Sequence, residues 1–220
     1  MQTIRLKHLA AIRWFHWINF PLLAAMIWSG LLIYWAFPTY SLGPIHFFPS
    51  WVYSTFHMDH RLADGMALHF FFMWLFAING LLYVLYTWVS GEWRYLLPRK
   101  RTALRDAWHV LLHDLHLRKA VPEQEKYNAA QQIAYTAIIL MGAGSLITGL
   151  AIYKPAQLNW LTELLGGYQV ARMLHFDLTV LYVLFFLVHV QQVLAAGWNN
   201  FRSMVSGWES RDEREKRPAS

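Results

Sequence analysis

Four of the eleven histidines in this 220-residue chain lie in segments that are almost free of charged residues: His16, His69, His175 and His189. An ionisable side chain in a long apolar segment is costly, which makes each of them a candidate functional residue. Two imidazoles that fill both axial positions of a haem iron suit electron transfer and disfavour oxygen binding. A solvated interfacial histidine is the alternative, which explains His16 taken alone but not all four together.

Cysteine is absent from the chain. This excludes covalently attached c-type haem, cysteine-ligated iron–sulfur clusters and thiolate zinc sites. Any cofactor must therefore be held by other ligands, and the imidazoles are the strongest candidates.

The segments that must position these histidines read as membrane spans. Only 15% of the residues are charged, whereas a soluble domain carries roughly 25%. A helix needs about 20 apolar residues to cross the hydrocarbon core. Four stretches without Asp, Glu, Lys or Arg are long enough: 14–58, 65–91, 127–153 and 178–201.

We therefore expect an all-α, integral membrane four-helix bundle that forms a single membrane domain over residues 1–220. The first stretch is far longer than the apolar region of a signal peptide and should remain as a helix. The helices are expected near residues 12–37, 65–90, 128–153 and 171–197.

The distribution of Lys and Arg predicts the orientation. Three lie in the first 13 residues, eight in the connection 91–127 and five in the tail 198–220, whereas the other two connections together hold three. Positive residues collect on the cytoplasmic side, so both termini, the 91–127 loop and the tail should be cytoplasmic. The net charge of +6 then faces anionic lipid, and nucleic acid need not be invoked.

With this orientation the histidines form pairs by depth. His16 and His189 lie toward the cytoplasmic face, and His69 and His175 toward the periplasmic face. His175 and His189 are 14 residues apart, a rise of about 21 Å, and lie within roughly 40° of one face of the helix. One helix can thus present a ligand at each of two depths.

Arginines and glycines accompany the histidines. Arg13 and Arg172 each lie three residues before a histidine, one turn nearer the surface, where a guanidinium can bind a haem propionate. Positive-inside anchoring is the alternative for Arg13. The third helix carries Gly142, Gly144 and Gly149, which would admit either a flat ring or a neighbouring helix.

The chain also resembles a known family. The strings RWFHWINF, LHFFFMWLFAINGLLYVLY, KYNAAQQIAY and ARMLHFDLTVLYVLFFLVHVQQVLAAGWNNFRSMVSG resemble the di-haem cytochrome b subunits of membrane oxidoreductases. That superfamily includes the cytochromes b of nickel–iron hydrogenases, the gamma subunits of formate dehydrogenases, and thiosulfate-reductase-type cytochromes b. The likeness spans about residues 10–207 and is greatest to the thiosulfate-reductase-type branch.

The resemblance implies two haems b in a multi-pass protein of the bacterial inner membrane. His16 with His189 would ligate the cytoplasmic haem, and His69 with His175 the periplasmic one. It further implies quinone as the membrane carrier and a periplasmic catalytic partner, a molybdenum enzyme or hydrogenase. The chain would be an electron-transfer subunit and not an independent enzyme, and a homodimer is left open.

The remaining polar residues have weaker interpretations. His57 and His60 lie just outside the second helix and compete less well than His69 as ligands. His109, His113 and His116 would lie on one face of a cytoplasmic helix. We interpret this as an amphipathic helix on the membrane surface, with a metal site as the alternative. The aromatic connection 38–60 would dock a partner or join the interfacial aromatic belt.

Amides and one carboxylate complete the set of candidates. Side-chain amides can donate to quinone carbonyls, and Asn19 and Gln192 are the quinone candidates, at a depth shared by Gln191, Asn199 and Asn200. Asp177 either handles protons or quinone, or hydrogen-bonds a neighbouring helix or partner.

Two function classes are compatible with these features. The first is a di-haem, quinone-reactive subunit that anchors a catalytic protein and exchanges electrons with it. The second is a haem-free metal-ion or proton transporter, although the internal repeats and broken helices typical of transporters are not evident. A reduced-minus-oxidised absorption spectrum discriminates between them.

Overall fold

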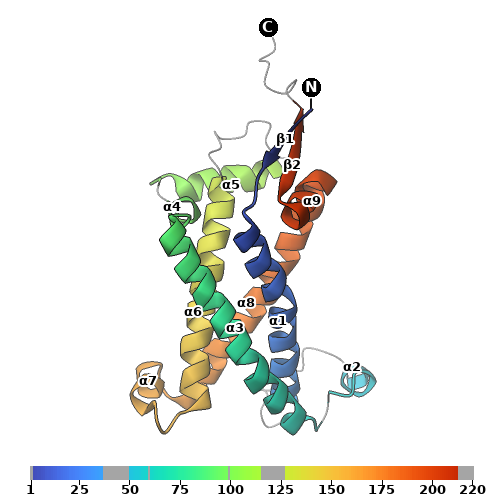
Figure 1. Ribbon diagram of the computed structural model, residues 1–220. Coiled ribbons are helices and arrows are strands. Elements are labelled where there is room, and N and C mark those ends of the chain that lie inside the picture. Colours follow the sequence, from blue (N-terminus) through green and yellow to red (C-terminus); the bar gives the residue numbers. More distant parts are fainter. Residues whose placement is uncertain (1, 37–49, 59, 99, 115–126, 213–220) are drawn as a thin grey trace. The chain divides into compact units, whose positions relative to one another are not determined.

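The computed structural model describes residues 2–36, 50–58, 60–98, 100–114 and 127–212. Four of the described helices are long and apolar enough to span a membrane (Figure 1): α1 (Ala10–Tyr34), α3 (Leu62–Ser90), α6 (Ala129–Tyr153) and α8 (Tyr168–Ala195). The predicted all-α, four-helix membrane fold is confirmed, with helix ends within three residues of the expected positions.

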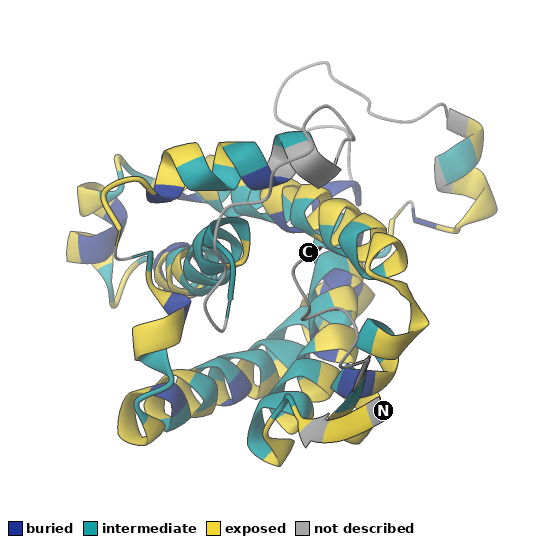
Figure 2. Cartoon of the chain, turned by 90° about the horizontal axis from the view of Figure 1, so that it is seen from above, coloured by how far each residue is buried: buried dark blue, intermediate teal, exposed yellow. Residues whose placement is uncertain are grey.

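The surfaces of these helices match a lipid environment. Large apolar side chains are exposed along them, such as Val89 at 77% and Leu194 at 75%. Exposed positions outnumber buried ones in Figure 2. In each of α3, α6 and α8, only 6% of an 18-residue apolar segment is buried. A water-soluble protein would not leave so much contiguous apolar surface uncovered.

Local sequence explains where α6 begins. The Asn128 side chain accepts from the backbone N–H of Gln131, and the Gln131 side chain accepts from the backbone N–H of Asn128. This reciprocal capping box satisfies amides that the first turn leaves without partners.

The chain divides into two compact units. The first contains Met1–Gly80 and Val183–Ser220, and the second contains Leu81–Tyr182. The boundaries fall within α3 and α8, so each of these helices contributes to both units.

In the first unit a segment near the start of the chain pairs with a segment near its end. Strand β1 (Gln2–Leu6) runs antiparallel to β2 (Trp208–Asp212), next to helix α9 (Gly197–Ser206). No secondary structure was predicted within the 198–220 tail. Short helix α2 (Ser50–Thr55) also belongs to this unit.

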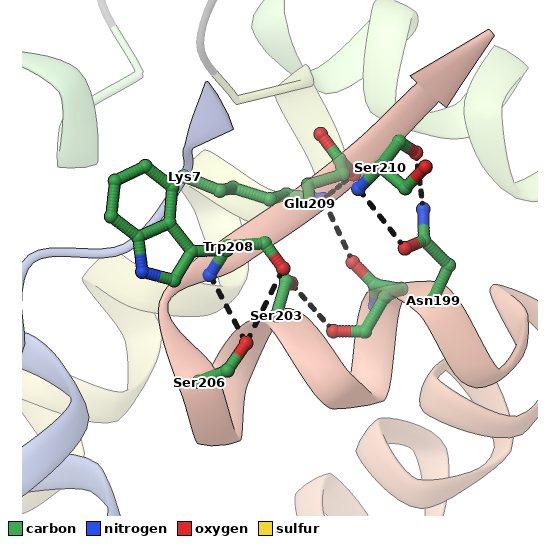
Figure 3. A network of polar contacts seen from close by, with 8 residues as sticks. Lys7, Asn199, Ser203, Ser206, Trp208, Glu209 and Ser210 are labelled. Atoms are coloured by element: carbon green, nitrogen blue, oxygen red, sulfur yellow. Dashed lines mark hydrogen bonds and ion pairs between the residues drawn. The ribbon is translucent and has the colours of Figure 1, made fainter. Parts of the chain in front are cut away.

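Polar contacts hold the terminal sheet against α9 (Figure 3). Lys7 Nζ donates to Asn200 Oδ1 at 2.9 Å and pairs with Glu209. The Asn199 amide donates to the carbonyl of Ser210 and accepts from its N–H. These contacts explain why a strand can form here without a larger sheet.

The second unit adds three short helices: α4 (Trp93–Leu96), α5 (Ala103–Asp114) and α7 (Asn159–Leu164). Helices α4, α5 and α7 contact α6, and Thr136 on α6 donates to the carbonyl of Leu96. The Thr162 hydroxyl of α7 donates to the carbonyl of Ala151, within the buried cluster around α6 and α7.

Candidate functional site

His16 on α1 and His189 on α8 face each other in the first unit. Their ring centres are 6.0 Å apart and their planes are tilted by 55°. The Trp17 ring meets His16 edge-on at 5.2 Å, and Phe185 stacks on His189 at 5.9 Å. The two imidazoles therefore face each other within an aromatic surround.

The spacing of this pair suits one metal ion between the rings. A metal-bound imidazole nitrogen lies about 2 Å from the metal, so rings on opposite sides of one ion have centres roughly 6 Å apart. His16 Nδ1 is buried and has no hydrogen-bond partner among the described residues. A buried ring nitrogen without a partner is unfavourable.

His69 on α3 lies against a hydroxyl and a glycine of α1. Its Nδ1 is 3.0 Å from the Ser29 Oγ. A Cβ on Gly30 would come within 3.4 Å of His69 Cε1, so the glycine leaves space for the edge of the imidazole.

His175 on α8 has a similar environment in the second unit. Its Nδ1 is 2.8 Å from the Thr148 Oγ1 of α6. A Cβ on Gly149 would come within 3.3 Å of His175 Cε1. Both histidines thus meet a hydroxyl residue that is followed directly by glycine on the adjacent helix.

His69 and His175 belong to different units, so their pairing stays a prediction. His175 and His189 do lie on one helix, α8, whose 14-residue interval corresponds to a rise of about 21 Å. Because α8 is one continuous helix, it can carry the two candidate ligands at two depths, as expected.

Arg13 has a contact that the sequence did not predict. Its Nη1 donates to the carbonyl of Val205 near the end of α9, where a cation interacts favourably with the helix dipole. Its Nε is buried and lacks a partner among the described residues. The Nε–H group could therefore donate to a haem propionate, and this contact stays a prediction.

Arg172 lies in the first turns of α8. Its Nη1 donates to Gln169 Oε1 at 3.2 Å, and its guanidinium lies 6.0 Å from the centre of the Tyr168 ring. These contacts orient the side chain within the second unit, and its role toward a propionate stays a prediction.

The glycines of α6 all meet side chains of α8. A Cβ on Gly142 would contact the Tyr182 hydroxyl, and one on Gly144 would lie 3.2 Å from Leu178. Helix packing therefore explains Gly142 and Gly144, whereas Gly149 faces a candidate ligand.

The predicted quinone residues lie near the His16–His189 pair in sequence. Asn19 and Gln192 each follow one of these histidines by three residues and are half-buried. Their amides make no hydrogen bond with any described residue, whereas Gln191 is exposed. Asn199 and Asn200 instead hold the terminal sheet.

Other candidates are less well placed. His57 and His60 lie outside α3 with positive φ angles of 48° and 59°. His109 lies on α5, which confirms a helix there, whereas the His113 side chain, His116 and residues 38–49 lie outside the described structure. Asp177 is exposed on α8, with no hydrogen bond or ion pair to a described residue.

Three polar residues around the histidines were missed: Ser29, Thr148 and Asn79. The last is buried on α3, and its amide donates to the carbonyl of Phe15 at 3.4 Å, beside His16. A hydroxyl residue directly before glycine inside an apolar span, at 29–30 and 148–149, is a signal that could have pointed to the first two.

The histidines do not form a protein-only metal cage. Among the residues that the structure describes, no group of three or more His, Cys, Asp or Glu could hold an ion. The facing imidazoles of His16 and His189 fit a group that supplies the other metal ligands itself, as haem would.

Four apolar spans, with His16 of α1 facing His189 of α8, are typical of a membrane-embedded b-type cytochrome. The chain belongs to the prokaryotic cytochrome b561 family, whose family model matches residues 7–207. It is also 33% identical over 179 residues to YedZ1 of Azospira oryzae, named as a protein-methionine-sulfoxide reductase subunit. The match covers 81% of this chain and 85% of that relative.

The family and the spans together establish the coarse function. The chain is a haem-binding electron-transfer subunit, and it is a multi-pass protein of the bacterial inner membrane. The superfamily resemblance read from the sequence is confirmed.

Proposed function

We propose that this chain is a di-haem b subunit that transfers electrons between the quinone pool and a periplasmic oxidoreductase, which it anchors. The observation that carries the proposal is the His16–His189 pair, whose ring centres are 6.0 Å apart. The hydroxyl and glycine contacts of His69 and His175 support a second site.

Each residue has a defined task in this proposal. His16 and His189 hold one haem, and His69 and His175 hold the other. Arg13 and Arg172 offer guanidinium groups to propionates at the two faces. When bound, the haems supply one-electron carriers at two depths, and bis-imidazole ligation leaves no position open for oxygen.

The orientation follows from the positive charges. Both termini, the 91–127 connection and the terminal sheet lie in the cytoplasm, because sixteen of the nineteen Lys and Arg belong to these segments. The His16–His189 site is then the cytoplasmic one. A cysteine accessibility assay with single cysteines at Glu209 and Lys154 tests this, since only the second should be labelled from the periplasm.

The partner of this chain is a periplasmic catalytic subunit, and the name of the YedZ1 relative makes a methionine-sulfoxide reductase the leading candidate. Quinol oxidation releases two electrons and two protons. Reduction of a sulfoxide to a thioether consumes two of each and releases water, so the reactions balance with electrons flowing outward. Reoxidation of the reduced haems by a methionine-sulfoxide peptide in native membranes tests this assignment.

Haem quantitation and redox titration of histidine variants test the ligand assignment. The wild-type protein should contain two haems b per chain. His16→Ala and His189→Ala should each remove one component, and His69→Ala and His175→Ala the other, because an imidazole ligand is lost in each case.

His60→Ala is the matched control, since this histidine lies outside α3; it should retain both haems. The pairing is wrong if His16→Ala and His69→Ala extinguish the same component. A haem-free protein would favour the transporter alternative.

A further inference from the structure

The two histidines assigned to the periplasmic haem share an unusual environment. Ser29 and Thr148 come from different helices and different units, yet each places its hydroxyl within 3.0 Å of a histidine Nδ1. Ser29 is fully buried, and Thr148 is only 4% exposed. The surrounding protein therefore shields both hydroxyls from solvent.

Each hydroxyl also contacts a carbonyl of its own helix. Ser29 Oγ donates to the carbonyl of Ala25 at 2.7 Å, and Thr148 Oγ1 donates to that of Gly144 at 2.7 Å. A hydroxyl has one proton and two lone pairs, whereas a carbonyl can only accept. The proton is therefore used by the helix backbone, and only a lone pair is left for the imidazole.

The short contact to Nδ1 is then a hydrogen bond only if the imidazole donates. A neutral imidazole carries its proton on one nitrogen and a lone pair on the other. With the proton on Nδ1, Nε2 is the nitrogen that can bind a metal.

We infer that Ser29 and Thr148 are positioning residues that hold His69 and His175 as Nδ1-protonated imidazoles and direct Nε2 of each to the haem iron. This inference rests on the proposed function, because it needs both histidines to be ligands. Gly30 and Gly149 support it, since each lets the ring edge approach the helix closely enough to reach the preceding hydroxyl.

The hydrogen bonds should also tune the haem. A ligand that donates its second ring N–H to an acceptor becomes more basic, which stabilises the ferric iron and lowers the reduction potential. His16 Nδ1 has no such partner in the described part of the chain. The hydroxyls thus distinguish the ligands of the two proposed haems.

The test compares variants of Thr148 and Ser29 in the purified holoprotein. Thr148→Val keeps the side-chain shape and removes the hydroxyl, whereas Thr148→Ser keeps the hydroxyl. Thr148→Val and Ser29→Ala should each shift the potential of one haem upward and alter its low-spin ferric EPR signal. The double variant should show the sum of the two shifts, and Thr148→Ser should restore the wild-type values.

Thr87→Val is the matched control. The Thr87 hydroxyl is also buried and donates to a carbonyl of its own helix. Both potentials should remain unchanged in this variant, so that loss of a helix-backbone hydrogen bond alone is ruled out as the cause of a shift.

Unchanged potentials in Thr148→Val and Ser29→Ala, with both haems present, would overturn the inference and leave the proposed function standing. If Thr148→Val loses a haem, retention in Thr148→Ser supports the inference, and loss in both variants overturns it. A wild-type protein that lacks haem would instead overturn the proposed function, and this inference with it.

Discussion

The candidate ligands differ in what surrounds each ring. His16 and His189 contact aromatic rings and each other, whereas His69 and His175 contact a hydroxyl and a glycine. Imidazole basicity depends on the partner of the non-ligating nitrogen. Two haems held by these pairs would therefore differ in potential, as is needed for directed electron flow.

Arg172 provides a further test at the residue level. A cation near a haem favours the reduced, more electron-rich form, so Arg172→Ala should lower the potential of the His69–His175 haem. An interaction of about 1 kcal/mol at a partly exposed site corresponds to roughly 40 mV for one electron. Spectroelectrochemical titration measures both haems, and the His16–His189 component serves as an internal reference.

Arg172→Lys is the conservative control. It keeps the positive charge, so the reduction potential of the His69–His175 haem should stay close to the wild-type value. If both components titrate as in the wild type after Arg172→Ala, the residue is a surface charge only.

Among the elements, α9 and the terminal sheet form a support beside the His16–His189 pair. Gly207 ends α9 with a φ angle of 93°, and its carbonyl accepts from the backbone N–H groups of Lys7 and His8. Its missing side chain leaves space for Arg13, because a Cβ there would lie 3.2 Å from the guanidinium carbon. Gly207, at the end of α9, thus contacts both α1 and the segment that follows β1.

Gly207→Ala should weaken this support. A left-handed conformation costs an L-residue about 1–2 kcal/mol, and the added Cβ would also press on Arg13 and on the His8 carbonyl. Hydrogen exchange should accelerate in β1 and β2.

Gly167→Ala is the control, because that residue has a φ angle of 94° but open space around it. It should leave exchange in the terminal strands unchanged. Equal acceleration in both variants would contradict a specific role for Gly207.

At the level of the whole molecule, the proposed electron path places the quinone near the cytoplasmic face. The connections that the proposed orientation places in the periplasm hold few charges and many aromatic residues, which suits burial against a catalytic partner. The other face then remains for quinone, where Asn19 and Gln192 offer amides without described hydrogen-bond partners.

Asn19→Ala and Gln192→Ala should each slow quinol-driven haem reduction. A lost hydrogen bond of about 1 kcal/mol corresponds to roughly a 5-fold effect. Stopped-flow reduction of variants that retain both haems measures it, with Gln191→Ala as the exposed neighbour that should react normally. Wild-type rates in both variants, or a quinone analogue bound beside His69, would place the site elsewhere.

The sequence alone determined the membrane fold and the candidate ligands. Twenty or more apolar residues without charge have few stable alternatives to a spanning helix, so the four spans were predicted to within three residues. An ionisable residue inside such a span is rare enough to stand out, which identified His16, His69, His175 and His189. The family followed from the same strings.

Only the tertiary structure decided what each side chain contacts. The pairing of β1 with β2 joins residues about 200 positions apart, and short polar strands carry little local signal. Likewise, Ser29 and Thr148 look like ordinary small residues of apolar helices until His69 and His175 are placed beside them. The contact of Arg13 with α9 is equally invisible in sequence, because a charge pattern predicts which face a residue prefers but not its partner.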